Sequence, residues 1–217
     1  MQLSIAGLGG IRKKGKKTMI GIIDYGAGNL FSLKNALDFL RLENKIISST
    51  EAIREADKLI LPGVGAFPDA MSMLHQSGLA ETIVEEAERK PLLGICLGMQ
   101  ILFEWGYEFE KVKGLGLIPG EVTLINAPGM KIPHMGWSDV KIENQCAISQ
   151  GITEGQRYYY VHSYKAVTEK RYVSVYSEYG DYIPGLVFKD KVFGTQFHPE
   201  KSGEIGLQLL ERFGGME

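Results

Sequence analysis

From Met19 onward, short apolar segments of strand length alternate with segments whose apolar residues recur at helical spacing. This alternation is typical of an α/β fold, in which helices cover a mainly parallel sheet. The strand that begins at residue 58 is expected to end before Pro62 and Gly63, which interrupt regular structure. The first half is predicted to contain strands over 20–24, 45–48, 58–61 and 92–95, and helices over 29–40, 69–90 with a break near Gly78, and 99–105.

The second half differs, because short β-rich runs follow one another with turn residues between them. Strands are predicted over 121–125, 158–166, 172–176, 186–189 and 192–196, and a last amphipathic helix over 205–213. Such runs indicate additional antiparallel strands. No repeat or linker divides residues 19–217, so we predict a single α/β domain with a mostly parallel central sheet flanked by helices.

Residues 1–18 form a basic N-terminal extension with five Lys or Arg residues and no acidic residue. The remaining chain then has 19 basic and 26 acidic residues, a formal charge of −7. This acidic body gives no reason to expect a nucleic-acid partner. The apolar stretch of the extension precedes its basic cluster, the reverse of a secretory signal. We expect a mobile tail or a start-site artefact upstream of Met19.

The two cysteines, Cys96 and Cys146, cannot form a disulfide framework and favour a reducing cytoplasm. No apolar run approaches the roughly 18 residues of a membrane-spanning helix, so no membrane association is predicted. No cluster of His and Cys has metal-ligand spacing, and no phosphate-binding glycine loop follows the first strand. We therefore predict neither a metal nor a cofactor.

Cys96 lies between Gly94 and Gly98 where a buried strand is expected to turn into a helix. Small residues on both sides of a nucleophile permit the strained strand-to-helix turn of a nucleophile elbow. A helix N-terminus favours the thiolate, and the N–H of Leu97 would face an oxyanion. Taken alone, a cysteine in an apolar strand is more often a core residue. Cys146 has no such surroundings, and we assign it no role.

A cysteine nucleophile needs a base, and His198 follows the predicted strand 192–196 and precedes Pro199 and Glu200. Residues two apart in an extended segment point the same way, so Glu200 is expected to orient the His198 ring. Alone, this segment would more often be a surface loop, but together with the cysteine elbow it suggests a triad. His75 and His162 are interpreted as structural.

The turn at 62–65 is expected to lie next to the site, where its backbone N–H groups would complete an oxyanion hole. The alternative is an ordinary strand-ending turn, in which Pro and Gly are common.

Over about 199 positions the chain resembles the class I (triad) glutamine amidotransferases, and within them most the glutaminase subunits of imidazole glycerol phosphate synthase. The resemblance rests on the segments IDYGAGNL (23–30), PGVGAF (62–67), GICLGMQ (94–100), PHMGW (133–137), YVHSY (160–164) and QFHPEKS (196–202). It implies a flavodoxin-like α/β domain over 19–217. It also implies that Cys96, His198 and Glu200 hydrolyse L-glutamine to glutamate and ammonia through a glutamyl thioester.

By the same resemblance, the N–H groups of Val64 and Leu97 form the oxyanion hole and Gly98 allows close approach of the substrate. The glutamine pocket is expected to include Gly63, Gly65, Gln100, Ser163 and Tyr164. The family commonly has Asn after Gly-Trp, where this chain has Ser138, so an amide contact at that place is in doubt.

The resemblance further implies a heterodimer with a (β/α)8 cyclase, which uses the ammonia to make imidazole glycerol phosphate and AICAR from PRFAR in L-histidine biosynthesis. The residues expected to face this partner are Met135, Trp137, Tyr159 and Lys201.

Three alternatives remain open on the sequence. The chain could be the glutaminase subunit of another synthase, for anthranilate, aminodeoxychorismate or pyridoxal phosphate. It could be a cysteine peptidase with the same elbow. It could also be an inactive binding subunit, which would leave three correctly ordered triad residues unexplained.

Overall fold

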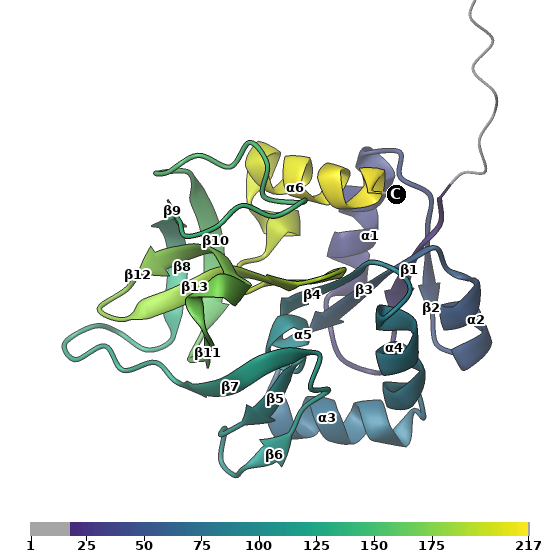
Figure 1. Ribbon diagram of the computed structural model, residues 1–217, viewed down its shortest axis with the longest axis horizontal. Coiled ribbons are helices and arrows are strands. Elements are labelled where there is room, and N and C mark those ends of the chain that lie inside the picture. The colour runs from purple at the N-terminus through teal and green to yellow at the C-terminus, as the bar shows by residue number, and fades with distance from the viewer. Residues whose placement is uncertain (1–17, 217) are drawn as a thin grey trace, which may run out of the picture.

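An eight-stranded sheet forms the centre of the computed structural model, which describes residues 18–216 (Figure 1). Its strand order is β2-β1-β3-β4-β14-β13-β12-β9. The strands are β1 (Ile20–Ile23), β2 (Asn44–Ile47), β3 (Lys58–Gly63), β4 (Leu92–Cys96), β9 (Lys141–Ile142), β12 (Val173–Glu178), β13 (Tyr182–Lys189) and β14 (Val192–Thr195). The pairs from β2 to β14 are parallel and those from β14 to β9 are antiparallel. The predicted α/β fold is confirmed.

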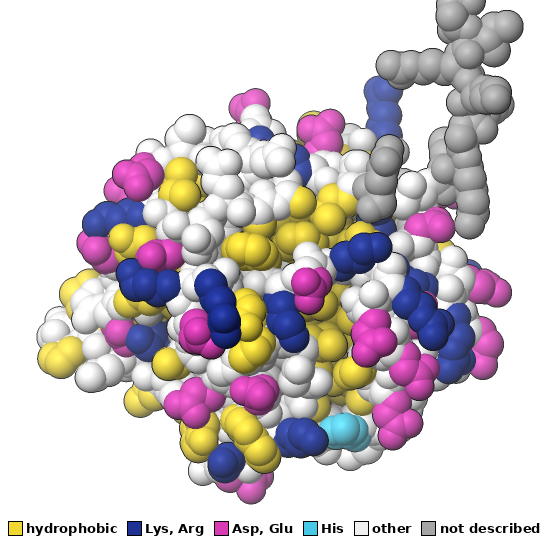
Figure 2. Space-filling model, viewed as in Figure 1, with side chains coloured by type: hydrophobic (Ala, Val, Ile, Leu, Met, Phe, Trp, Pro, Cys, Tyr) yellow, Lys and Arg dark blue, Asp and Glu magenta, His cyan; other side chains and the backbone are white. Residues whose placement is uncertain are grey.

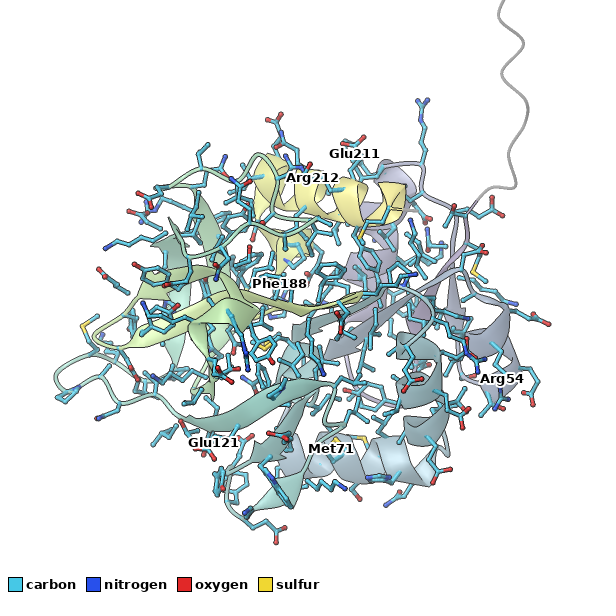
Figure 3. All side chains as sticks on the ribbon, in the orientation of Figure 1. Arg54, Met71, Glu121, Phe188, Glu211 and Arg212 are labelled. Atoms are coloured by element: carbon cyan, nitrogen blue, oxygen red, sulfur yellow. The ribbon has the colours of Figure 1, made fainter. Side chains whose placement is uncertain are left out.

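Helices cover both faces of this sheet, α1 and α6 on one side and α3 and α4 on the other (Figure 1). The helices are α1 (Leu30–Phe39), α2 (Thr50–Glu55), α3 (Phe67–Gln76), α4 (Ala80–Ala87), α5 (Leu97–Gln100) and α6 (Gly203–Gly215). Successive residues of β3 enter opposite cores, because strand side chains alternate between faces: Leu59 and Leu61 join one cluster and Ile60 the other. Met71 of α3 is 1% exposed and lies on the side of the helix that faces the sheet (Figure 3).

Two smaller sheets stand beside the central one. β8 (His134–Asp139) and β10 (Arg157–His162) pair antiparallel as a two-stranded ribbon. The other sheet has the order β11-β7-β5-β6. Its strands are β11 (Tyr164–Val167), β7 (Ile118–Leu124), β5 (Phe103–Gly106) and β6 (Val112–Lys113), and the short helical turns η1 (Lys170–Tyr172) and η2 (Pro199–Lys201) complete the elements.

The helix predicted over 99–105 is wrong. Helix α5 ends at Gln100, and residues 103–106 form β5, paired with both β6 and β7. A Cβ at Gly106 would stand 2.5 Å from the ring of Phe67, the first residue of α3, so this segment packs closely against the start of that helix. Hydrogen bonding to two strands outweighs the helical periodicity of a short apolar segment.

Several strands also differ from prediction. β3 continues through Pro62 and Gly63, which pair with Ile95 and Cys96 in a parallel ladder. The strand predicted over 158–166 is divided at Ser163 into β10 and β11, which belong to different sheets. Strand β8 was not predicted, since Pro133 and Gly136 make its segment read as a loop. The break at Gly78, which has φ +70°, is confirmed.

The described surface mixes both signs of charge: on the face in Figure 2, Lys and Arg side chains alternate with Asp and Glu. In residues 18–216, no helix has the length and apolar character needed to cross a bilayer. The expectation of a mobile or artefactual extension over 1–18 concerns residues that, except for Thr18, lie outside those the structure describes.

Candidate active site

Cys96 occupies a strained turn at the junction of β4 and α5. Its backbone angles are φ 56° and ψ −113°, a region that costs a residue with a side chain about 1–3 kcal/mol. Neighbouring glycines make the turn possible. A Cβ at Gly94 would stand 2.5 Å from the Gly98 carbonyl oxygen, and a Cβ at Gly98 would stand 1.8 Å from that of Leu61. The glycine spacing therefore lets α5 pack directly on β4 and β3 and raises Cys96 at the carboxyl edge of the sheet.

His198 and Glu200 are joined by a hydrogen bond of 2.8 Å from His198 Nδ1 to Glu200 Oε1. Both side chains are buried, 4% and 3% exposed. Residues 199–201 form the 3-10 turn η2 rather than the extended segment assumed from the sequence. The turn still brings the carboxylate behind the ring. Because Nδ1 is held by Glu200, Nε2 is the ring nitrogen available to the thiol, and it has no other partner in the protein.

The electrostatics of His198 combine opposing effects. Burial lowers its pKa, but the neighbouring Cys96 side chain and the hydrogen-bonded Glu200 carboxylate raise it, giving a pKa of about 9. The Cys96 sulfur therefore shares a cavity with an imidazole whose raised pKa favours the protonated ring.

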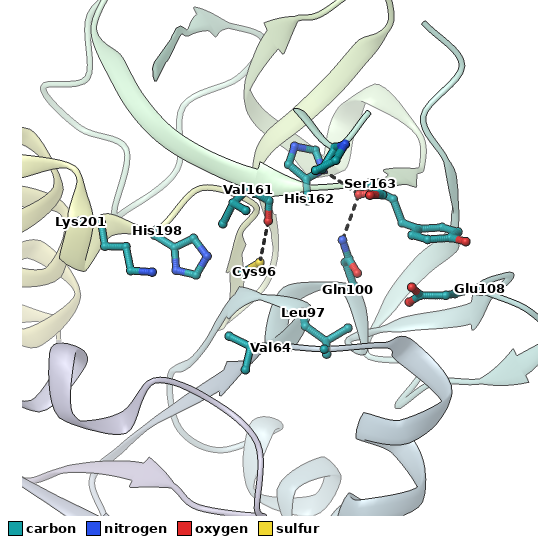
Figure 4. A pocket seen from close by; sticks show the side chains of 13 residues that line it. Val64, Cys96, Leu97, Gln100, Glu108, Val161, His162, Ser163, His198 and Lys201 are labelled. Atoms are coloured by element: carbon teal, nitrogen blue, oxygen red, sulfur yellow. Dashed lines mark hydrogen bonds between the residues drawn. The ribbon is translucent and has the colours of Figure 1, made fainter. Parts of the chain in front are cut away.

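Cys96 and His198 line a cavity of about 340 Å³, seen from close by in Figure 4. Nine residues singled out from the sequence line it: Val64, Gly65, Cys96, Leu97, Gln100, Ser163, Tyr164, His198 and Lys201. The structure adds Glu108, Pro133, Val161 and His162. The cavity thus collects residues from β4, α5, β10, β11 and η2 and from the turn after β3, which are far apart along the chain.

The remaining predicted residues lie elsewhere. Gly63 and Glu200 line a second, smaller space on the other side of His198. Gly98 is not among the cavity residues, and the space where its side chain would stand is taken by the Leu61 carbonyl. Met135, Trp137 and Tyr159 are on the outer face of the β8–β10 ribbon. Met135 is 61% and Trp137 48% exposed, and the Trp137 and Tyr159 rings meet edge to face with centroids 6.0 Å apart.

Glu108 is the acidic residue that the sequence analysis missed. It follows β5, in a region assigned to helix and loop, and no motif marked it. Its carboxylate accepts a hydrogen bond of 2.7 Å from the Phe67 N–H, while burial raises its pKa. In Figure 4 it lies at the end of the cavity away from His198, where a carboxylate suits a ligand ammonium group.

Two buried glutamines connect the cavity wall to the nucleophile. Gln100 Nε2 donates to the Tyr164 carbonyl and to Gln196 Oε1, each at 3.0 Å. Because its Oε1 accepts, Gln196 presents its amide N–H groups to Cys96, with Nε2 3.9 Å from Sγ. The Val161 carbonyl lies 3.8 Å from the same sulfur (Figure 4). Gln196 was quoted in a sequence motif but given no role.

The hole for an oxyanion would be bounded by Val64 and Leu97. Leu97 begins α5, so its N–H belongs to the first turn, which has no intrahelical partner. Val64 is 46% exposed, next to Gly65 with φ +103°. The Tyr25 hydroxyl lies against Gly63 at the end of β3 and is buried without a hydrogen-bond partner. Among the described residues, no group of three or more His, Cys, Asp or Glu side chains could hold a metal ion.

Comparison with known proteins agrees with this geometry. The family model of class-I glutamine amidotransferases matches residues 21–214. The imidazole glycerol phosphate synthase subunit HisH of Bacillus cereus (strain G9842) is 48% identical over 199 residues, 91% of this chain and 95% of the relative. The HisH subunit of Bacillus thuringiensis (strain Al Hakam) is 47% identical over the same shares.

Solved structures share the fold. A structure of PurLQS from Thermotoga maritima superposes with a TM-score of 0.72 at 21% identity, covering 91% of this chain and 98% of the other. A glutamine amidotransferase structure gives 0.70 at 24% identity, covering 90% and 98%. With a family model matched over nearly all the described residues and HisH subunits close to half identical, the chain belongs to the class-I glutamine amidotransferase family.

Proposed function

We propose that this chain is the glutaminase subunit of an imidazole glycerol phosphate synthase. It hydrolyses L-glutamine to L-glutamate and ammonia for use in L-histidine biosynthesis. The observation that carries the proposal is the strained Cys96 in a cavity it shares with His198, whose Nδ1 is held by Glu200 at 2.8 Å. The choice of synthase is supported by the 48% identity to HisH subunits.

In the first half-reaction the Cys96 thiolate attacks the side-chain amide carbon of glutamine. The tetrahedral oxyanion is stabilised by backbone N–H groups, for which Leu97 and Val64 are the candidates. The His198 imidazolium gives its Nε2 proton to the departing nitrogen, so ammonia leaves and a glutamyl thioester remains. The neutral ring then takes a proton from water, hydroxide adds to the thioester, and glutamate leaves as the thiolate re-forms. Glu200 orients the ring throughout.

The cavity suits glutamine at both ends. Cys96 and the proposed oxyanion donors define the amide end. At the end of the cavity away from His198, the Glu108 carboxylate is available to the α-ammonium group (Figure 4). Gln100, Ser163 and Tyr164 lie between these ends and are proposed to position the substrate, partly through backbone groups. A volume of about 340 Å³ accommodates one amino acid of this size.

The ammonia is proposed to pass to a (β/α)8 cyclase partner that converts PRFAR to imidazole glycerol phosphate and AICAR. Exposed Met135 and Trp137, together with half-buried Tyr159, form a candidate docking surface on the outer face of the β8–β10 ribbon. Lys201 borders the cavity and is exposed, which suits a place where the two proteins meet. The free cysteines fit the proposal of a cytoplasmic location.

The test is turnover of the reconstituted synthase with glutamine or with ammonium salt. Cys96→Ala should abolish the glutamine-dependent reaction and leave the ammonia-dependent reaction intact. The isolated chain should hydrolyse glutamine weakly, and the rate should rise when the cyclase and its nucleotide substrate are added. Co-purification with a chorismate-using synthase instead of a barrel cyclase, or full glutamine turnover by Cys96→Ala, would refute the proposal.

A further inference from the structure

The β8–β10 ribbon has two different faces. One presents Met135, Trp137 and Tyr159 to the outside, as described above. The opposite face is buried and polar, with His134 1% and His162 6% exposed. These histidines stand directly opposite each other in the antiparallel register. The sequence analysis interpreted His162 as structural and gave His134 no role. Both lie behind the proposed partner surface, and His162 also lines the glutamine cavity.

The two histidines belong to a continuous row of hydrogen bonds. Ser138 Oγ lies 2.7 Å from His134 Nε2, and His134 Nδ1 lies 3.0 Å from His162 Nε2. His162 Nδ1 then lies 2.7 Å from the Tyr164 carbonyl oxygen. Figure 4 shows this last bond at the cavity wall, where the same carbonyl also accepts from Gln100.

The direction of every bond follows from its fixed end. A carbonyl oxygen can only accept, so His162 Nδ1 carries a hydrogen. A neutral His162 then has a bare Nε2, which must accept from His134 Nδ1–H. A neutral His134 in turn has a bare Nε2, which must accept from the Ser138 hydroxyl. The row therefore runs one way, from Ser138 through His134 and His162 to the Tyr164 carbonyl.

The surroundings keep both rings neutral. Burial lowers the pKa of His134 to about 4. Burial, opposed by the hydrogen bond to Tyr164, lowers the pKa of His162 to about 3. The His134 ring is also enclosed between the rings of Tyr160 and Tyr179, with centroids at 4.8 Å and 4.0 Å. No acidic residue forms a hydrogen bond or ion pair with either imidazole in the described chain.

We propose that His134 and His162 are positioning residues: they hold the bend between β10 and β11 at Ser163 in place and so fix the wall of the glutamine cavity. This inference rests on the proposed glutaminase function. The Tyr164 carbonyl is the point where the bend is fixed, because it accepts from the cavity residue Gln100 on one side and from His162 on the other. Gln100 leads on to Gln196 and the Cys96 sulfur.

A second consequence concerns the partner. Ser138 is on the same strand as Met135 and Trp137, so a displacement of β8 at the outer surface changes the first bond of the row. The row thereby links the proposed docking strand to the cavity wall through side chains rather than through the strained turn at Cys96. The Ser138 hydroxyl supplies the donor that the His134 ring requires.

The kinetic test uses the complex with the cyclase. His134→Phe keeps a ring between the two tyrosines and removes both ring nitrogens. We expect KM for glutamine to rise about tenfold, with kcat within about threefold of wild type, since a lost hydrogen bond to the wall weakens positioning more than chemistry. Ser138→Ala should raise KM about threefold. His134→Gln, which again offers a donor and an acceptor, should recover part of the loss.

Tyr179→Phe is the matched control, because it keeps the ring beside His134 and deletes only an exposed hydrogen bond to the Lys131 carbonyl, which lies outside the row. Its KM should stay within about twofold. Ammonia-dependent turnover should be retained by all variants, which shows that each complex is assembled. An unchanged KM in both His134→Phe and Ser138→Ala would overturn the proposal.

The tautomers provide a test that does not depend on activity. In ¹⁵N spectra of the histidine rings at pH 7, both His134 and His162 should be neutral with hydrogen on Nδ1. Hydrogen on Nε2 of His162, or an imidazolium at either residue, would overturn the row. If the wild-type complex did not hydrolyse glutamine, the proposed function would fail, while the tautomers would still decide whether the row exists.

Discussion

Replacing Glu200 by Gln tests how the carboxylate controls His198. The ring has a pKa of about 9, where an ordinary histidine has 6.5, and Glu200 is one of two groups that raise it. The other is Cys96, and burial acts against both. Gln has the same shape and still accepts from Nδ1, but it carries no charge. Without the carboxylate, the opposing effect of burial is less fully offset, so the pKa is expected to fall toward the ordinary 6.5, with that value taken as the limit of the shift.

The size of the effect follows from this shift. A ring with pKa 9 is almost fully protonated at pH 7 and half protonated at pH 9. With a pKa of 6.5, about a quarter of the rings are protonated at pH 7 and about 0.3% at pH 9. The imidazolium population therefore falls about fourfold at pH 7 and about 150-fold at pH 9. Since the raised pKa favours the protonated ring, its benefit is present at low pH and is lost as the pH rises through about 9.

The assay is kcat/KM for glutamine hydrolysis by the complex between pH 6 and 10, because this ratio reports the ionisations of the free enzyme. Glu200→Gln should move the alkaline limb from near pH 9 toward pH 6.5. Glu204→Gln, an exposed acid in the first turn of α6, is the control and should leave the limb in place. The same fractional loss at pH 7 and pH 9 would show that Glu200 does not act through the His198 charge.

Three further predictions concern stability and the elbow. A Gly-to-Ala change normally stabilises a helix, but Gly98→Ala should lower the melting temperature and the glutaminase rate, because the new Cβ would meet the Leu61 carbonyl at 1.8 Å. A stabilised, active variant would refute the packing argument. Tyr25→Phe should raise the free energy of unfolding by about 1 kcal/mol in denaturant titration, since the buried hydroxyl has no partner; a loss of stability would mean that it has one. Lys58→Met should lower the free energy of unfolding by about 2 kcal/mol, because Lys58 donates to the carbonyls of Phe213, Gly214 and Met216 where α6 ends. The control Lys45→Met, at an exposed place on β2, should change it by less than about 0.5 kcal/mol.

The alternation of strand and helix was readable along the first half of the chain because each buried parallel strand is a short apolar run bounded by turns. The Cys96 elbow was also readable, since its glycines are local requirements of packing at 2.5 Å and 1.8 Å. The helix predicted over 99–105 failed for the opposite reason. Residues 103–106 form a strand only because β6 and β7, from later in the chain, provide hydrogen-bonding partners.

The amino-acid sequence by itself determined the fold class and singled out Cys96, His198 and Glu200 as the candidate triad, because these inferences depend on residue types at fixed local spacing. Only the tertiary structure decided that Glu108 closes the far end of the cavity and that His134 and His162 form a directed row behind it. Those roles depend on which carbonyl, hydroxyl or ring comes within hydrogen-bonding distance across different sheets. The physical reason is that a hydrogen bond is decided over about 3 Å in space, and spacing along a chain does not specify that distance between separate strands.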